Sequence, residues 1–126
     1  MCKILLSINP RHVEHILEGS KKYEFRKVRC RKDVDKILIY ATAPQKKVVA
    51  EADIEDIIID VPNAVWEKTK DFAGITYSFF ESYYKGKSIA IAYKLRNVIT
   101  FDKPLSLNDL GITNAPQSFI YLNTKD

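Results

Sequence analysis

The sequence predicts an α+β fold in which five to six strands form a closed or partly closed barrel with short helices at its sides. Apolar segments bounded by turn residues provide the strands, and segments with apolar residues three and four apart provide the helices. With 126 residues, 46% of them hydrophobic, the chain has the size of one globular domain spanning residues 1–126. Closing the sheet would remove its exposed edges.

The first expected strand covers residues 3–8, and a helix follows it directly. Asn9 is a suitable N-cap, and Pro10 suits the first helical position. Gly19 is expected to end the helix, because glycine readily adopts the left-handed conformation of a C-terminal cap. The chain therefore passes from this helix directly into the segment GSKKYEFRK at residues 19–27.

The remaining elements follow in a regular order. They are a central strand at 36–41, an alternating strand at 47–55, a helix from 62 that Gly74 ends, a short helix at 76–84, the longest strand at 89–96, a mostly irregular stretch at 104–115 and a last strand at 119–122. The short helix carries the capping-box pattern Ser78-x-x-Glu81. The aromatic residues of that helix are expected to pack in the core rather than to stack on bases, and they are Tyr77, Phe79, Phe80, Tyr83 and Tyr84.

The segment at 19–27 has the alternation of a strand. Tyr23 and Phe25 would share the face that packs on the core, while Glu24 and Arg26 would line a surface or cleft. Lys22 lies two residues before Glu24 and would therefore share its face of the strand. Strict alternation places Lys21 with the aromatic residues instead, unless the strand begins after it or a bulge resets the phase.

Charge is concentrated in the same region. The net charge is +4, but residues 19–36 hold eight basic and three acidic residues, a local charge of 8 − 3 = +5. Residues 51–81 hold two lysines and eight acids, a local charge of 2 − 8 = −6. The basic stretch suits an anionic partner, with a solvated hairpin as the alternative. A protein-interaction adaptor that uses the acidic stretch is a further alternative.

The side chains of the segment suggest how an anionic ligand would be bound. Lys21, Lys22, Arg26 and Lys27 would meet phosphate groups, whereas the carboxylate of Glu24 would accept a hydrogen bond from a base or transfer a proton. The alternative is an internal ion pair that only orders the strand. An amide and a hydroxyl near the C-terminus are candidate partners at the mouth of the cleft, namely Gln117 and Ser118.

No metal or cofactor is predicted. His12 and His15 lie three apart but lack an evident third ligand, so we expect both to face solvent. Cys2 and Cys30 have no metal-site spacing, and reduced thiols in a cytoplasmic protein are the expectation. No apolar stretch approaches the length of a membrane span, so no membrane partner is predicted.

The spacing Gly-x-Lys-x-x-Glu-x-Arg, present as Gly19, Lys21, Glu24 and Arg26, resembles the signature of the ASCH domain family in the PUA-like superfamily. The stretches at 5–10, 40–44 and 116–119 are also similar to the short bacterial and archaeal members. This resemblance implies a PUA-like mixed β-barrel with flanking helices and a cleft along which the signature lies. It also implies binding of RNA, a nucleotide or a nucleoside, and in some members a regulatory role.

The resemblance also raises catalysis. Some relatives are amidohydrolases that remove the acetyl group of N4-acetylcytidine with a lysine, a threonine and a glutamate. By motif position the lysine corresponds to Lys21, the threonine position holds Glu24, and the nearest carboxylate for the third residue is Asp71. Another relative is a ribonuclease. The leading prediction is an RNA- or nucleotide-binding module, and the alternative is a small amidohydrolase with Lys21 and Glu24 as catalytic residues.

Overall fold

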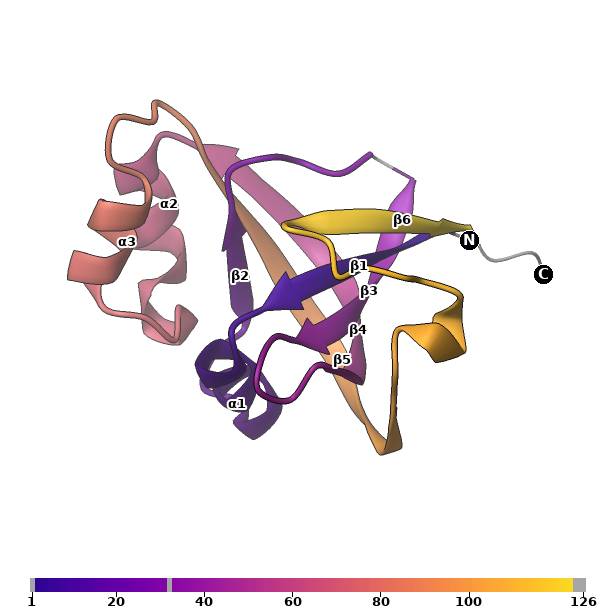
Figure 1. The fold of residues 1–126 in the computed structure, drawn as a ribbon. Coiled ribbons are helices and arrows are strands. Elements are labelled where there is room, and N and C mark those ends of the chain that lie inside the picture. Colours follow the sequence, from indigo (N-terminus) through magenta and orange to yellow (C-terminus); the bar gives the residue numbers. More distant parts are fainter. Residues whose placement is uncertain (1, 32, 124–126) are drawn as a thin grey trace.

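The computed structural model describes residues 2–31 and 33–123. The predicted reduced thiol of Cys2 concerns a side chain that lies outside what the structure describes. Six strands and three α-helices make up most of the chain (Figure 1). The strands are β1 (Cys2–Ile8), β2 (Tyr23–Arg26), β3 (Val34–Ala41), β4 (Lys47–Asp60), β5 (Ala90–Leu105) and β6 (Phe119–Asn123). The helices are α1 (Pro10–Glu18), α2 (Pro62–Thr69) and α3 (Tyr77–Tyr83), with short 3₁₀ turns η1 (Lys70–Phe72) and η2 (Asn108–Leu110).

The strands form one mixed sheet in the order β2-β5-β4-β3-β1-β6. β1 and β3 run parallel, and the other neighbouring pairs are antiparallel. The sheet curls into a half-barrel, with α2 and α3 beside β2 at one end and α1 next to the carboxyl end of β1 (Figure 1). The predicted fold class, a PUA-like α+β barrel with flanking short helices, is therefore confirmed.

Side-chain alternation distributes the apolar residues over both faces of the sheet. Ile4, Leu6 and Ile8 of β1 belong to the largest buried cluster, which α1 also joins, whereas Leu5 faces the other side. A second cluster lies between the sheet and α2 and α3, and a third lies under residues 105–112. β3 contributes to the two faces alternately, as expected of the predicted central strand.

The termini of α1 agree with the prediction. The side chain of Asn9 accepts a hydrogen bond from the backbone N–H of Arg11 at 2.9 Å, and Pro10 occupies the first turn. Gly19 has φ +93° and donates its N–H to the carbonyl of Ile16. These contacts satisfy backbone groups that the helix itself leaves without partners, and they fix where the chain enters β2.

Two local predictions were wrong. The N-cap of α3 is Thr76, whose hydroxyl accepts from the N–H of Phe79 at 3.1 Å, and not Ser78. The strand predicted at 89–96 is too short, because β5 runs from Ala90 to Leu105, while the stretch after it is mostly irregular, as predicted. Pairing with β4 extends the strand through residues 97–105, whose polar and apolar side chains do not alternate regularly, as in the pair Ala50 and Thr100.

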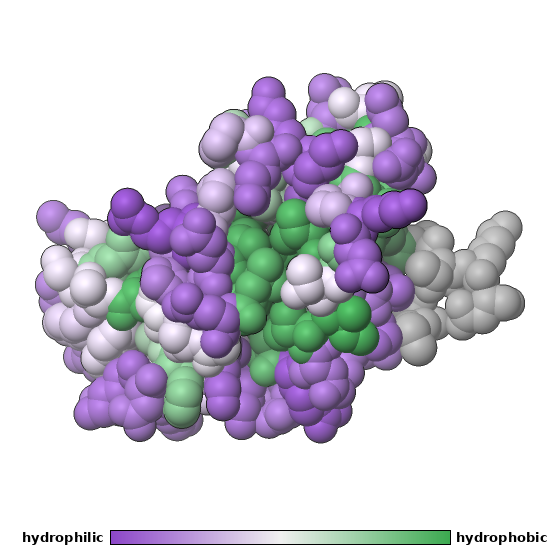
Figure 2. All heavy atoms as spheres, turned by 90° about the horizontal axis from the view of Figure 1, so that it is seen from below, coloured by the Kyte–Doolittle hydropathy of each residue, from purple (hydrophilic) through white to green (hydrophobic). Residues whose placement is uncertain are grey.

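The face seen from the side of α1 has apolar residues in its middle and hydrophilic residues around them (Figure 2). No helix within the described ranges is long and apolar enough to cross a membrane. Likewise, the part of the chain that the structure describes holds no group of three His, Cys, Asp or Glu side chains placed to bind a metal ion.

Candidate functional site

A cleft opens on the side of the half-barrel where β2 approaches the carboxyl end of β1. Its volume is about 140 Å³, which is room for one small planar group rather than for a drug-sized ligand. Three walls enclose it: the β1–α1 junction (Ser7, Ile8, Asn9, His12), the segment around β2 (Lys21, Glu24, Phe25, Arg26) and the α3 region (Ile75, Phe79, Tyr83).

Lys21 enters this cleft because β2 begins only at Tyr23. Its backbone N–H donates to the carbonyl of His15, so Lys21 precedes the strand and the alternation does not apply to it. The side chain is 3% exposed, and its Nζ donates to the carbonyl of Ala73 at 2.7 Å. Nζ also lies 4.8 Å from the ring centroid of Phe25. Lys21, and not Lys22, therefore joins Glu24 in the cleft.

Gly74 makes room for the stem of Lys21. A Cβ atom on this glycine would lie 2.4 Å from the Cβ of Lys21, and its φ of +68° is one that side chains disfavour. The predicted helix break at Gly74 thus has a second role, because the turn after η1 closes over the buried lysine.

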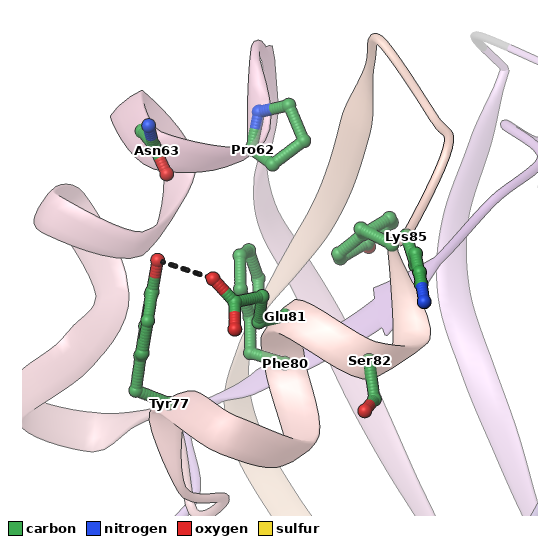
Figure 3. Close-up of a pocket in the computed structure, with 8 residues that line it drawn as sticks. Pro62, Asn63, Tyr77, Phe80, Glu81, Ser82 and Lys85 are labelled. Carbon is green, nitrogen blue, oxygen red and sulfur yellow. Dashed lines mark hydrogen bonds between the residues drawn. The ribbon is translucent and has the colours of Figure 1, made fainter.

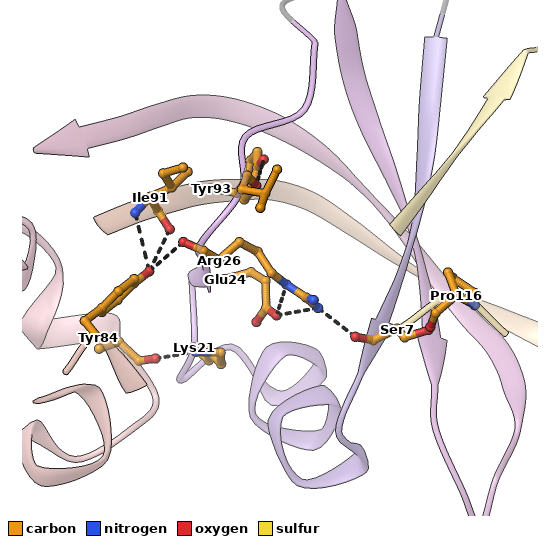
Figure 4. A network of polar contacts seen from close by, with 10 residues as sticks. Ser7, Lys21, Glu24, Arg26, Tyr84, Ile91, Tyr93 and Pro116 are labelled. Carbon is orange, nitrogen blue, oxygen red and sulfur yellow. Dashed lines mark hydrogen bonds and ion pairs between the residues drawn. The ribbon is translucent and has the colours of Figure 1, made fainter. Parts of the chain in front are cut away.

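Glu24 and Arg26 form an ion pair on the cleft wall (Figure 4). Nε and Nη2 of Arg26 lie 3.1 Å and 3.0 Å from Oε2 of Glu24, and Nη2 also donates to the carbonyl of Ser7 at 2.6 Å. Both side chains are largely buried, with 7% and 12% exposure. Arg26 therefore bridges β2 to β1 across the open side of the half-barrel and neutralises a buried carboxylate.

Burial also changes the ionisation of the cleft. Desolvation lowers the pKa of Lys21 from 10.5 to about 8, and Arg26 adds to this, while Glu24 partly opposes it. The pKa of His12 is lowered by burial and by Lys21. At neutral pH the cleft thus holds a neutral histidine and a lysine that loses its proton far more readily than an exposed one.

The expected exposure of His12 was wrong. Its ring is half-buried, lines the cleft and packs edge-on against Phe79 at a centroid distance of 5.5 Å. Among the side chains that the structure describes, its Nδ1 is the one buried polar atom without a hydrogen-bond partner. The sequence signal was its place in the first turn of a helix that follows a strand directly, since this puts its side chain near the strand's carboxyl end.

The aromatic residues of α3 and of its C-cap divide between the core, the cleft and, for Tyr77, the exposed surface. Phe80 and Tyr84 are buried, as predicted, and the hydroxyl of Tyr84 donates to the carbonyls of Arg26 and Ile91. Phe79 is 49% exposed and Tyr83 half-buried, and both line the cleft. A core assignment for all of them was therefore wrong, because one turn of helix presents neighbours to different faces.

The other candidate residues lie around the cleft rather than in it. Lys22 is exposed, with Nζ 4.2 Å from the ring centroid of Phe72, and Lys27 lies 4.4 Å above Tyr83. Gln117 and Ser118 are exposed and adjoin the cleft through Ser7, whose N–H donates to the carbonyl of Ser118. An exposed turn also carries the candidate third acid, Asp71, which is not one of the cleft-lining residues.

A second hollow of about 450 Å³ lies between α2 and α3 (Figure 3). The hydroxyl of Tyr77 donates to Glu81 at 3.2 Å on one side, and Lys85 lies on the other. Its charged groups are exposed, whereas those of the first cleft are buried. Buried ion pairs and groups with shifted pKa values are typical of functional sites. These properties favour the first cleft as the candidate functional site.

Comparison with protein families and curated proteins identifies relatives over nearly the whole chain. The family described as a domain of unknown function, DUF365, matches residues 4–115. An ASCH domain-containing ribonuclease of Zymomonas mobilis is 28% identical over 127 residues, which cover 97% of this chain and 85% of that protein. The large ribosomal subunit protein uL22 of Ureaplasma parvum is 29% identical over 120 residues. This match covers 94% of the chain, which spans only 39% of the length of that relative.

The solved structures include a closely similar fold. The crystal structure of ASCH from Zymomonas mobilis superposes with a TM-score of 0.87 and 28% sequence identity, covering 96% of this chain and 87% of that one. The similarity therefore extends over the sheet, the helices and the segment that carries the cleft residues.

Proposed function

Because this chain belongs to the DUF365 family and has the ASCH fold, we propose that it is an RNA- or nucleotide-binding module whose cleft holds one base. The observation that carries this proposal is the buried carboxylate of Glu24, which is neutralised by Arg26 and faces aromatic walls. The relative named as a ribonuclease supports RNA as the ligand class. The matched segment of uL22 suits a module, here residues 1–126, that also occurs within longer proteins.

The geometry of Glu24 suits recognition of an N–H group. Arg26 uses only Oε2, and Oε1 has no partner among the described residues, so this oxygen can accept a hydrogen bond from a ligand. A base edge supplies such donors, and the faces of Phe79 and Tyr83 supply stacking surface. The small volume of the cleft admits a base while the sugar and phosphate remain outside.

Binding titrations with a panel of nucleosides and short single-stranded RNAs test this proposal. Glu24→Gln keeps the shape but removes the charge, and it should weaken binding about tenfold or more, because hydrogen bonds to charged groups contribute about 1.5–3 kcal/mol. Glu51→Gln is the matched control, since Glu51 is also an ion-paired glutamate of the sheet, bonded to Lys3 at 3.0 Å. No binding by the parent, or equal affinity of parent and Glu24→Gln, would refute the proposal.

A second candidate is a small amidohydrolase, favoured by the buried amine of Lys21 and its pKa of about 8. A lysine that deprotonates near neutral pH can act as a base or nucleophile. Glu24, however, stands where the amidohydrolase relatives have a threonine, and a carboxylate offers no hydroxyl. We therefore expect slow or absent hydrolysis of N4-acetylcytidine by the parent protein.

Hydrolysis time courses separate the two candidates. Lys21→Ala should abolish any hydrolysis present, while Glu24→Thr should leave the rate unchanged or raise it. The same panel of RNAs should be followed for cleavage as well as for binding. If the parent hydrolyses N4-acetylcytidine with a kcat/KM above about 10⁴ M⁻¹s⁻¹, the binding-module proposal is refuted and the amidohydrolase is supported.

A further inference from the structure

We propose that the backbone phosphates of a single-stranded RNA bind along residues 27–31, here called the basic loop. The bound strand would run from the cleft toward Tyr121 on β6. The inference rests on the proposed function and deepens it. It specifies the ligand as a strand of several nucleotides and gives the direction in which that strand leaves the cleft. The observation behind it is that exposed cations of this loop lie over aromatic rings at both of its ends.

The basic loop connects the cleft with the far edge of the sheet. Lys27 follows Arg26 directly, and its Nζ lies 4.4 Å from the ring centroid of Tyr83, which lines the cleft. At the other end, the guanidinium carbon of Arg31 lies 4.1 Å from the ring centroid of Tyr121. Figure 1 shows this connection running from the end of β2 over β6 toward β3. Four residue steps reach at most about 14 Å, so the two ends are close enough for one short strand to contact both.

Hydrogen bonds from below hold the basic loop in place. The hydroxyl of Tyr93, on the buried face of β5, accepts from the N–H of Cys30 at 2.8 Å and donates to the carbonyl of Val28 at 3.3 Å. Burial raises the pKa of Tyr93, so the phenol keeps the proton that it donates. The hydroxyl of Tyr121 accepts from the N–H of Arg31 at 3.1 Å. A loop ordered before binding costs less conformational entropy when the ligand arrives.

The cleft itself has no cation available for phosphate. Arg26 is held by Glu24 and Ser7, and Lys21 donates to Ala73 in the buried interior. The side chains of Lys27, Arg29 and Arg31 are exposed. Arg31 contacts Asp33 at 3.4 Å, but that pair is more than half exposed and is therefore weak. Cations beside aromatic faces are the combination that binds single-stranded nucleic acid.

The test uses the double variant Arg29→Ala/Arg31→Ala and a labelled single-stranded RNA of about eight nucleotides. Each phosphate contact on a single strand contributes about 0.7 to the slope of log affinity against log salt. The variant should therefore reduce that slope by about 1.4 while the affinity for a free nucleoside stays unchanged. Arg29→Lys/Arg31→Lys keeps both charges and should keep the slope.

A matched control is Lys47→Ala/Lys103→Ala. It removes two exposed cations from the end of the β4–β5 pair that lies away from β2. An unchanged slope in the arginine variant, or an equal loss in the control, would overturn the path along the basic loop. Competition by oligoglutamate as effective as that by RNA would assign the surface to an acidic protein instead and would also overturn it. If the parent binds neither RNA nor a nucleoside, the proposed function itself fails. If it binds a nucleoside but no RNA, only the path along the basic loop fails, so the two failures are distinguishable.

Discussion

Lys21→Met is expected to change the stability of the protein in a way that depends strongly on pH. Lys21 is 3% exposed, and burial lowers its pKa from 10.5 to about 8. Because the pKa of Lys21 is higher in the unfolded chain, its amine binds a proton more tightly there than in the folded protein. Keeping Lys21 charged therefore destabilises the folded protein fully below pH 8, and the penalty disappears as the pH rises toward 10.5.

The size of the effect follows from the shift. A difference of 10.5 − 8 = 2.5 units, at about 1.4 kcal/mol per unit, gives a penalty of about 3 kcal/mol at pH 7 and about 1 kcal/mol at pH 9.5. Methionine removes this titration. It also leaves the carbonyl of Ala73 without its partner, at a cost of about 1–3 kcal/mol. That second cost does not vary with pH, so the pH dependence isolates the charge.

Urea unfolding at pH 7 and pH 9.5, followed by the fluorescence of the single tryptophan, Trp66, measures the difference. The stability of Lys21→Met relative to the parent should fall by about 2 kcal/mol between the two pH values. Titration of other groups is common to both proteins and cancels. A relative stability that stays constant over this range would show that Lys21 is not desolvated, and the proposed cleft chemistry would lose its basis.

Two further substitutions test the supports of the cleft. Gly74→Ala should lower the free energy of unfolding by about 1–3 kcal/mol and weaken ligand binding, because its Cβ would collide with Lys21. Gly86→Ala is the control: Gly86 has a similar φ of +77° but open space around it, so this variant reports the backbone strain alone. Arg26→Ala should cost about 3–5 kcal/mol in urea unfolding, because it removes the ion-pair partner of the buried carboxylate of Glu24. Equal losses for the two glycine variants, or a fully stable Arg26→Ala, would contradict these assignments.

Most elements were predictable because their signals are local. Asn9, Pro10 and Gly19 specify the ends of α1 through contacts within a few residues. The alternation of β2 places Glu24 and Arg26 on one face, as predicted, and they do meet in one ion pair. These features depend on backbone periodicity and capping, which the sequence carries directly.

The predictions that were wrong concern contacts between distant segments. Whether Lys21 or Lys22 enters the cleft depends on where β2 begins, and pairing with β5 begins at Tyr23. The exposure of His12 and Phe79 depends on the approach of α3 to α1, which joins residues more than sixty positions apart. A single sequence contains no signal for such an approach, since each helix alone only presents an apolar face.

The ion pair of Arg26 also bears on how this protein would bind the RNA or nucleotide that we propose as its ligand. An arginine in a basic motif suggests a phosphate contact, but here it holds a buried carboxylate and closes the half-barrel onto Ser7. Base contacts give specificity and phosphate contacts give position and affinity. In this protein the two tasks would fall to different segments, with Glu24 in the cleft selecting the base and the basic loop holding the strand. Substitutions in the cleft should then change which ligand is bound at nearly constant salt dependence, and substitutions in the loop should do the reverse.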